Sequence, residues 1–177
     1  MPLSHVPWQM TVTPVTLFLQ MAERAEWIFL AYRVPREPST PRITLWRKLK
    51  RLGVAQIVDG LVALPLDARN REQLEWLAEE IAEARGQASI WKAQPTTTRQ
   101  EHDLVAGMQS AINAEYENVI AEATSATQDA MTVHRRFLKR LRAEIRRIQR
   151  RDYFPTEKGV EARRAVEKLA GTMDAVG

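Results

Sequence analysis

The chain has 177 residues, of which 45% are hydrophobic and 27% charged, as is typical of one soluble globular domain with a small appendage. It contains no cysteine, which excludes disulfides, thiolate metal sites and cysteine nucleophiles. No run reaches about 18 consecutive apolar residues, so the sequence predicts no membrane span. The formal net charge is only +4, but the positive residues are clustered, which indicates an anionic partner.

Residues 1–24 are expected to form a loosely ordered leader. Thr11 to Met21 is fairly apolar, but no basic residue precedes it and Pro14 interrupts it. A secretory signal needs a basic start followed by an unbroken apolar run. We therefore expect no export and a cytoplasmic location.

A strand and a helix are predicted next. Residues 27–34 are aromatic and β-branched and stop at Pro35, which is typical of a buried strand. Ser39 or Thr40 can cap the following helix, and Gly53 ends it. The expected buried stripe of this helix is formed by Ile43, Trp46, Leu49 and Leu52.

A hairpin, a helix and a strand follow. Asp59-Gly60 separates the apolar runs 56–58 and 61–64, and both turn positions tolerate the positive φ of a tight hairpin. Asn70 can cap a second helix that ends around Arg85-Gly86, and residues 88–91 form a last strand. The apolar stripe of this helix consists of Leu74, Leu77 and Ile81.

The element order over residues 25–95 is therefore strand, helix, strand, strand, helix, strand. This order predicts a ferredoxin-like βαββαβ unit of the α+β class, with two helices on one face of a four-stranded antiparallel sheet. The tryptophans of this unit are expected to face the core: Trp27, Trp46, Trp76 and Trp91.

Residues 96–177 predict a region of about three helices, at roughly 99–123, 129–151 and 157–170. The apolar side of the first is expected to hold Leu104, Met108, Ile112, Tyr116, Val119 and Ile120, and that of the second Phe137 or Leu138, Leu141, Ile145 and Ile148. His134 lies on this second seam and is expected to pack there. The helices could cover the open face of the sheet or form an antiparallel arm that mediates dimerisation.

Two basic clusters stand out. The first lies on the first helix and consists of Arg42, Arg47, Lys48, Lys50 and Arg51. On DNA these residues would neutralise phosphates and release counterions, whereas the alternative is a solvated helix face.

The second cluster, residues 135–151, holds nine basic residues and one acid, Glu144. Arg135, Arg142 and Arg146 recur at steps of seven and four, and arginine suits tetrahedral oxyanions because its planar fork donates two parallel hydrogen bonds. The alternative is pairing with acids of the preceding helix, namely Glu101, Asp103, Glu115, Glu117 and Glu122.

Catalysis finds little support in the sequence. It has no glycine-rich phosphate loop, nucleophile elbow or paired-ligand histidine helix. With scattered histidines and no cysteine, we expect no metal site and no cofactor. Small metal-dependent nucleases of ferredoxin-like fold place an aspartate at the end of the first strand, whereas no carboxylate occurs here until Glu37. A nuclease is therefore a distant third hypothesis, and we expect no enzyme.

Several segments resemble the N-terminal domain of the ChrB family of chromate-resistance regulators. They are residues 27–35, 46–53, Asp59-Gly60 with the run to Pro65, 74–77 with Gly86, and the arginine-rich helix that ends at 151–155. The series covers about residues 25–170. Members commonly carry a second, C-terminal domain, so sensing could be partly lost here or a separate protein could supply that half.

The resemblance implies a DNA-binding transcriptional regulator that responds to chromate. Arg42, Arg47, Lys48, Lys50 and Arg51 are then the candidates for operator DNA, and Arg135, Arg142 and Arg146 those for the oxyanion. A homodimer is expected because operators are usually two-fold symmetric. The alternative hypothesis is a non-enzymatic interaction subunit that works with a separate C-terminal-type ChrB protein.

Overall fold

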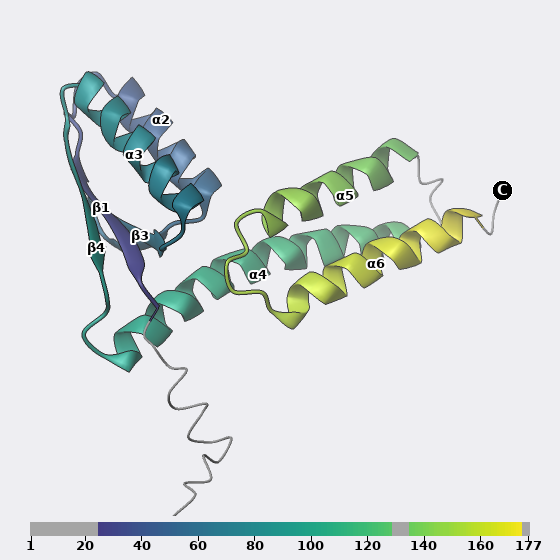
Figure 1. Ribbon diagram of the computed structural model, residues 1–177. Coiled ribbons are helices and arrows are strands. Elements are labelled where there is room, and N and C mark those ends of the chain that lie inside the picture. Colours follow the sequence, from purple (N-terminus) through teal and green to yellow (C-terminus); the bar gives the residue numbers. More distant parts are fainter. Residues whose placement is uncertain (1–24, 129–134, 175–177) are drawn as a thin grey trace, which may run out of the picture.

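The computed structural model describes residues 25–128 and 135–174 (Figure 1). It has a four-stranded antiparallel sheet with interleaved helices, followed by three further helices. The predicted α+β class and helical C-terminal region are therefore confirmed, while the finer ferredoxin-like assignment stays a prediction. The predicted leader 1–24, residues 129–134 of the predicted second arm helix and the packing of His134 lie outside the described residues.

The elements follow one another in this order: β1 (Trp27–Arg33), α2 (Thr40–Leu52), β2 (Ala55–Val58), β3 (Leu61–Pro65), α3 (Ala68–Glu83), β4 (Gln87–Ala93), α4 (Thr98–Gln128), α5 (Arg135–Gln149) and α6 (Glu157–Asp174).

The sheet has the strand order β2-β3-β1-β4, with all neighbours antiparallel. The predicted Asp59-Gly60 hairpin joins β2 and β3, and Gly60 takes a φ of 78°. The backbone N–H of Tyr32 donates to the Gly60 carbonyl oxygen at 2.6 Å, so the turn is tied to the end of β1.

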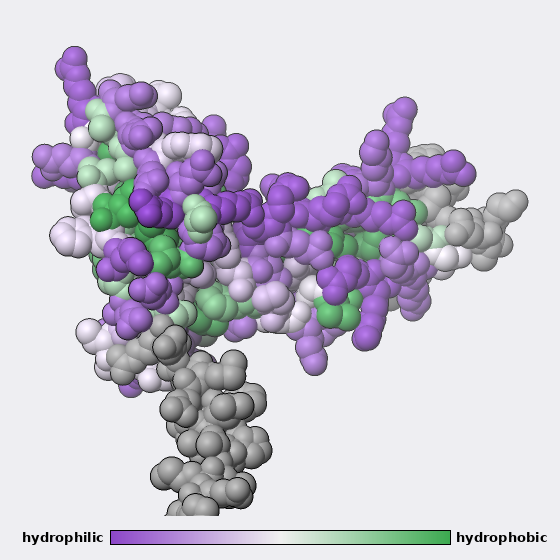
Figure 2. All heavy atoms as spheres, viewed as in Figure 1, coloured by the Kyte–Doolittle hydropathy of each residue, from purple (hydrophilic) through white to green (hydrophobic). Residues whose placement is uncertain are grey.

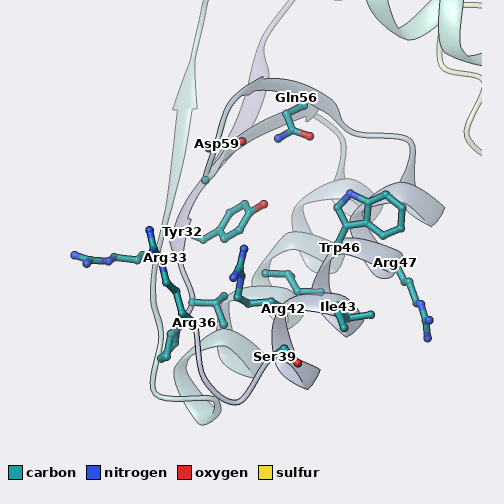
Figure 3. A pocket seen from close by; sticks show the side chains of 14 residues that line it. Tyr32, Arg33, Arg36, Ser39, Arg42, Ile43, Trp46, Arg47, Gln56 and Asp59 are labelled. Carbon is teal, nitrogen blue, oxygen red and sulfur yellow. The ribbon is translucent and has the colours of Figure 1, made fainter.

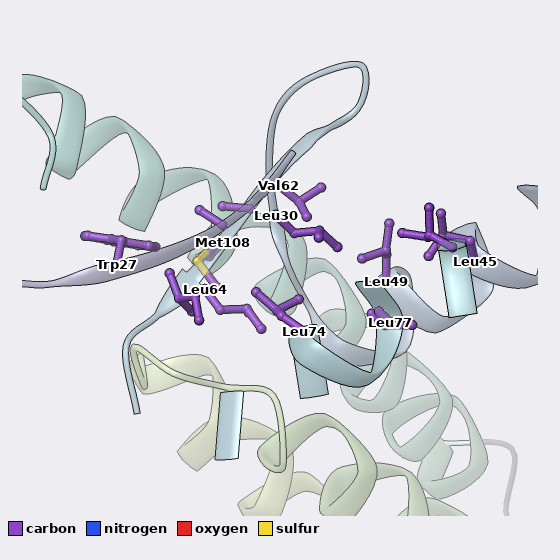
Figure 4. Packing of buried hydrophobic residues seen from close by; sticks show 13 residues of the cluster. Trp27, Leu30, Leu45, Leu49, Val62, Leu64, Leu74, Leu77 and Met108 are labelled. Atoms are coloured by element: carbon purple, nitrogen blue, oxygen red, sulfur yellow. The ribbon is translucent and has the colours of Figure 1, made fainter. Parts of the chain in front are cut away.

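The first core lies between the sheet and helices α2 and α3 (Figure 4). Leu30 of β1 faces Val62 of β3 and Ile90 of β4, and directly opposed residues share a face of the sheet. The helices contribute Leu45 and Leu49 from α2, and the predicted Leu74, Leu77 and Ile81 from α3.

The predicted burial of the tryptophans is wrong for three of the four. Trp27 is fully buried, but Trp46, Trp76 and Trp91 are 56%, 52% and 61% exposed. In α2 the buried stripe runs through Leu45 and Leu49, which turns Trp46 and the predicted Ile43 outward. Leu45 and Leu49 lie one turn apart and face the core. Because Trp46 is next to Leu45 in the sequence, helical spacing alone does not decide which of the two is buried.

The predicted cap of α3 is also displaced. Asp67 is the N-cap, and its carboxylate accepts from the Asn70 N–H at 2.6 Å. Asn70 is instead a buried first-turn residue whose amide nitrogen donates to the Pro65 carbonyl oxygen at 2.9 Å. Its side chain therefore joins the helix start to the end of β3.

Helix α4 takes part in two cores. Leu104 and Met108 pack against the sheet core, whereas Ile112 and Tyr116 begin a second cluster. This second core lies between α4, α5 and α6, which pack on one another as an arm that extends from the sheet unit (Figure 1). Of the two predicted arrangements, the arm is the one observed, and it consists of the distal half of α4 together with α5 and α6.

Charged and polar side chains cover the outer side of this arm in the view of Figure 2, and hydrophobic residues follow the seam between its helices. In the described ranges, no helix combines the length and apolar character that crossing a membrane requires.

Two glycine substitutions should change stability in opposite directions. At Gly60, alanine would combine a positive φ with a Cβ atom 2.5 Å from the Tyr32 carbonyl oxygen, and we expect Gly60→Ala to lower the free energy of unfolding by about 1–3 kcal/mol. At Gly107, in the middle of α4, a Cβ atom meets nothing within 4 Å, so Gly107→Ala should raise it by about 0.5–1 kcal/mol. Urea unfolding of both variants tests this, and equal effects would contradict it.

Candidate anion-binding groove

A basic groove lies where the arm meets the sheet unit. We call it the junction groove; it has a volume of about 1080 Å³ and lies between α2, the start of α3, the middle of α4 and the end of α5. Its cationic wall consists of Arg47, Lys50, Arg51, Arg69, Arg147, Arg150 and Arg151, against one acid, Glu115. The fold therefore joins part of each predicted basic cluster in one concave surface.

Helix α2 supplies the first wall because burial of Leu45 and Leu49 turns its charged side outward. Arg47, Lys50 and Arg51 are all exposed and line the groove. The ammonium of Lys50 lies 5.0 Å from the centroid of the Trp46 ring, in a cation–π contact.

The other two predicted DNA residues of α2 lie elsewhere. Lys48 forms an ion pair with Glu80 of α3, which offsets its charge. Arg42 lines a separate hollow beside the N-terminal half of α2. Three of the five predicted residues are thus brought together in the groove.

The end of α5 supplies the opposite wall. Burial of Leu141, Ile145 and Ile148 in the arm core leaves Arg147 and Arg150 exposed. Cations are favourable in the last turn of a helix, where unpaired carbonyl groups carry partial negative charge. Arg69, at the start of α3, completes the wall and was absent from the sequence-based candidates.

Arg151 fastens the two walls together and is itself only 11% exposed. Its guanidinium pairs with Glu115 of α4, and its Nη1 donates to the Lys50 carbonyl oxygen at 3.3 Å. Its side chain also passes close to Gly53, where an added Cβ would lie 3.1 Å from the Arg151 Cβ. Arg151 is thus an anchor of the junction more than a free anion ligand.

Tyr153 and Phe154 seal the junction beneath the groove. The Tyr153 hydroxyl donates to the Leu52 carbonyl oxygen at 2.9 Å, with Asn70 Oδ1 as a second acceptor at 3.2 Å. The Phe154 ring lies 5.9 Å from the Trp27 ring. Burial raises the pKa of Tyr153, so this phenol stays protonated and can keep donating.

The fully buried Tyr116 and the partly buried Asp152 form a pair on the arm side of the junction. The Tyr116 hydroxyl donates to Asp152 Oδ2 at 3.1 Å. Burial raises the pKa of Tyr116 to about 12, with the nearby Asp152 charge as the next cause. Burial also raises the pKa of Asp152, although the hydrogen bond from Tyr116 opposes that shift.

The predicted oxyanion residues lie outside this groove. Arg135, Arg142 and Arg146 share one side of α5, but at a rise of about 1.5 Å per residue the row is about 16 Å long. Arg142 Nη2 lies 3.3 Å from Glu167 of α6, and Arg135 lines a shallow hollow at the start of α5. One oxyanion is too small to contact all three residues of a row of this length. The row is better suited to an extended polyanion, or to separate oxyanions at separate residues.

The alternative pairing with acids is found for part of the basic helix. Glu122 and Glu115 of α4 pair with Arg140 and Arg151. Arg147 pairs with Glu144 in its own helix.

The other acids named in that alternative have different contacts. Asp103 pairs with Arg99 at 3.9 Å and Glu117 with Lys158 at 3.9 Å, while Glu101 accepts the Ala25 N–H at 2.8 Å. Along the described part of the chain, no group of three or more His, Cys, Asp or Glu residues could hold a metal ion.

Comparison with known proteins gives a family match and one curated relative. A family model described as "Protein ChrB, N-terminal" matches residues 42–176, which include every residue of the groove. Protein ChrB of Cupriavidus metallidurans (strain ATCC 43123 / DSM 2839 / NBRC 102507 / CH34) is 28% identical over 146 residues, covering 81% of this chain. The chain spans 45% of that relative's length. No solved structure matches.

The raised pKa of Tyr116 predicts a loss of stability in alkali. Since the folded state holds the phenol proton up to a pKa of about 12, its contribution to stability is complete below the ordinary pKa of about 10. That contribution is lost as the pH rises through the folded value. Between pH 10 and 12, the free energy of unfolding should therefore fall more steeply for the wild type than for Tyr116→Phe. Urea unfolding at several pH values measures both slopes, and parallel slopes would contradict the prediction.

Proposed function

The chain belongs to the ChrB N-terminal domain family, and we propose that it is a DNA-binding transcriptional regulator of chromate resistance. The observation that carries the proposal is that the fold brings basic residues of α2 and α5, about a hundred residues apart in sequence, to one groove. Chromate resistance, with which the family is associated, supplies the setting.

The junction groove suits a phosphate backbone. Seven cations line it against one acid, and the single ion pair across it, between Arg151 and Glu115, uses the least exposed of the cations. Phosphates that enter would compete with Glu144 for Arg147, whose side chain is 57% exposed, and would displace the counterions around the other exposed cations. The released ions favour binding at low salt. Arginine forks add directed hydrogen bonds to phosphate oxygens.

A response to chromate is the second part of the proposal. Arg135, Arg142 and Arg146 remain the candidate oxyanion residues, and their guanidinium groups can each donate two parallel hydrogen bonds to a tetrahedral dianion. The ion pair between Arg142 and Glu167 is exposed to solvent: the Arg142 side chain is 45% exposed and the Glu167 side chain 67%. Exposed pairs are weak, so an oxyanion can compete for Arg142.

We infer a ferredoxin-like unit, which the strand order β2-β3-β1-β4 and the packing of α2 and α3 against the sheet support. We also propose a cytoplasmic homodimer, because two-fold symmetric operators are read by two-fold symmetric proteins.

A subunit that acts through protein contacts is the second candidate. The observation in its favour is that four cations of the second basic cluster, residues 135–151, already pair with glutamates of this chain: Arg140, Arg142, Arg147 and Arg151. In that reading α5 stabilises the arm, and a separate C-terminal-type ChrB protein would supply sensing.

The groove is tested by removing cations from each wall. Arg47→Ala with Lys50→Ala, and Arg147→Ala with Arg150→Ala, should each lower the slope of log affinity against log salt for upstream operator DNA by about two, since each lost phosphate contact removes about one. Titrations at several salt concentrations measure the slopes.

The matched control removes the same charge from α6. Arg164 and Lys168 are exposed and are not part of the groove lining, so Arg164→Ala with Lys168→Ala should leave the slope nearly unchanged. Loss of slope only with the α2 pair would contradict a shared groove. Operator binding that is absent under all conditions would favour the interaction subunit.

Chromate should weaken operator binding, while sulfate at the same concentration should not. Arg142→Ala should then remove most of the chromate effect without changing affinity in its absence, because Arg142 lies outside the groove. Lys139→Ala, at an exposed α5 position, is the control. An Arg142→Ala protein that responds to chromate like the wild type would contradict the assignment of Arg142 as a chromate ligand.

A further inference from the structure

A second hollow lies on the other side of Trp46 from the junction groove. We call it the aromatic hollow; it has a volume of about 940 Å³ and is framed by the end of β1, the N-terminal half of α2 and the β2–β3 turn (Figure 3). The lining residues that matter here are Tyr32, Arg42, Trp46, Arg47, Gln56 and Asp59.

Trp46 and Arg47 form the ridge between the two surfaces. Both residues line the groove and the hollow, whereas Lys50 lines the groove and not the hollow. The Lys50 ammonium lies over the Trp46 ring at 5.0 Å, so it occupies the groove side of the indole. Trp46 remains 56% exposed and also lines the hollow.

The remaining lining groups combine ring stacking with hydrogen bonding. Tyr32 comes from β1 and directs its hydroxyl into the space between α2 and the β2–β3 turn, with Arg42 beside it (Figure 3). Gln56 of β2 and Asp59 of the β2–β3 turn approach from the opposite side (Figure 3). Gln56 offers both a donor and an acceptor, and the Asp59 carboxylate accepts only.

Each group has a counterpart in one class of ligand. Aromatic side chains stack on nucleobases whatever their identity, because every base has a π face. Amide and carboxylate groups bind the edges of unpaired bases, and arginines bind the phosphate attached to them. The ridge also places a hollow large enough for a base directly beside a groove suited to phosphates.

We propose that the aromatic hollow binds an unpaired nucleobase, stacked on Trp46 and Tyr32, with its phosphate held by Arg42. The base could belong to a free mononucleotide or to a nucleic acid strand whose backbone lies in the junction groove. The second source rests on the proposed DNA-binding function, whereas the first does not.

The test compares ligands that differ only in the base. Affinities are measured for a short single-stranded oligothymidylate and for an abasic strand of the same length and charge. Stacking of one base contributes at least about fivefold in affinity, so the wild type should prefer oligothymidylate by that factor or more. Thymidine 5′-monophosphate and deoxyribose 5-phosphate form the matching pair of free ligands.

Three exposed tryptophans provide matched variants. Trp46→Ala should abolish the preference for the strand with bases, and Trp46→Phe, which retains a ring, should restore part of it. Trp91→Ala and Trp76→Ala remove indoles of similar exposure on other elements and should leave the preference intact.

The outcomes separate this inference from the DNA-binding proposal. Salt-dependent binding of duplex and of both strands, with no preference for bases and none for the mononucleotide, would overturn the hollow and leave the groove standing. A preference that Trp91→Ala abolishes as fully as Trp46→Ala would also overturn it. If no strand or duplex binds, the groove proposal fails, and binding of thymidine 5′-monophosphate over deoxyribose 5-phosphate then decides the inference alone.

Discussion

The positions of the charged surfaces depend on the contact between residues 151–154 and the end of the sheet unit. Arg151 reaches across to the backbone of α2, Tyr153 donates to the last residue of that helix, and Phe154 packs near Trp27. These contacts hold the end of α5 beside α2. Without them the two basic surfaces would be separate helix faces, and a groove between them would not exist.

The arm tolerates its charge because its inward face is so apolar. Leu141 and Ile148 are fully buried, and burial of such side chains contributes about 1.5–3 kcal/mol each. Repulsion among the cations of α5 is reduced by pairs to Glu122, Glu144 and Glu167, which lie along its flanks. In the groove next to its C-terminal end, the only lining acid is Glu115, so positive charge is concentrated there.

Local signals in the sequence predicted most of the elements. Gly53 does end α2, Asp59-Gly60 does form the β2–β3 turn, and the apolar positions of α3, α4 and α5 are those expected from helical spacing. The spacing misassigned α2, because Trp46 and Leu45 are neighbours and only tertiary packing decides which one points inward. An aromatic side chain turned outward therefore became visible only in the fold.

The site was harder to predict than the elements. Both basic clusters were evident as runs of arginine and lysine, but their meeting depends on hydrogen bonds between residues 101 positions apart, from Arg151 to Lys50 and from Tyr153 to Leu52. No helical or strand period encodes such a contact. A concentration of arginine followed, after Asp152, by the aromatic pair Tyr153-Phe154 was the one available sign that α5 ends against another element.

The continuity of α4 makes the sheet unit and the arm energetically interdependent. Met108 and Ile112 lie one turn apart on a helix of 31 residues, yet they belong to different cores. Unfolding of either core would expose part of α4 and remove a helix against which the other core packs. The sheet unit and the arm should therefore unfold cooperatively, although they are separate in space. Torque applied at one end of this helix, by a ligand on the sheet unit, would in the same way be transmitted to the arm as a rigid lever rather than absorbed by a linker.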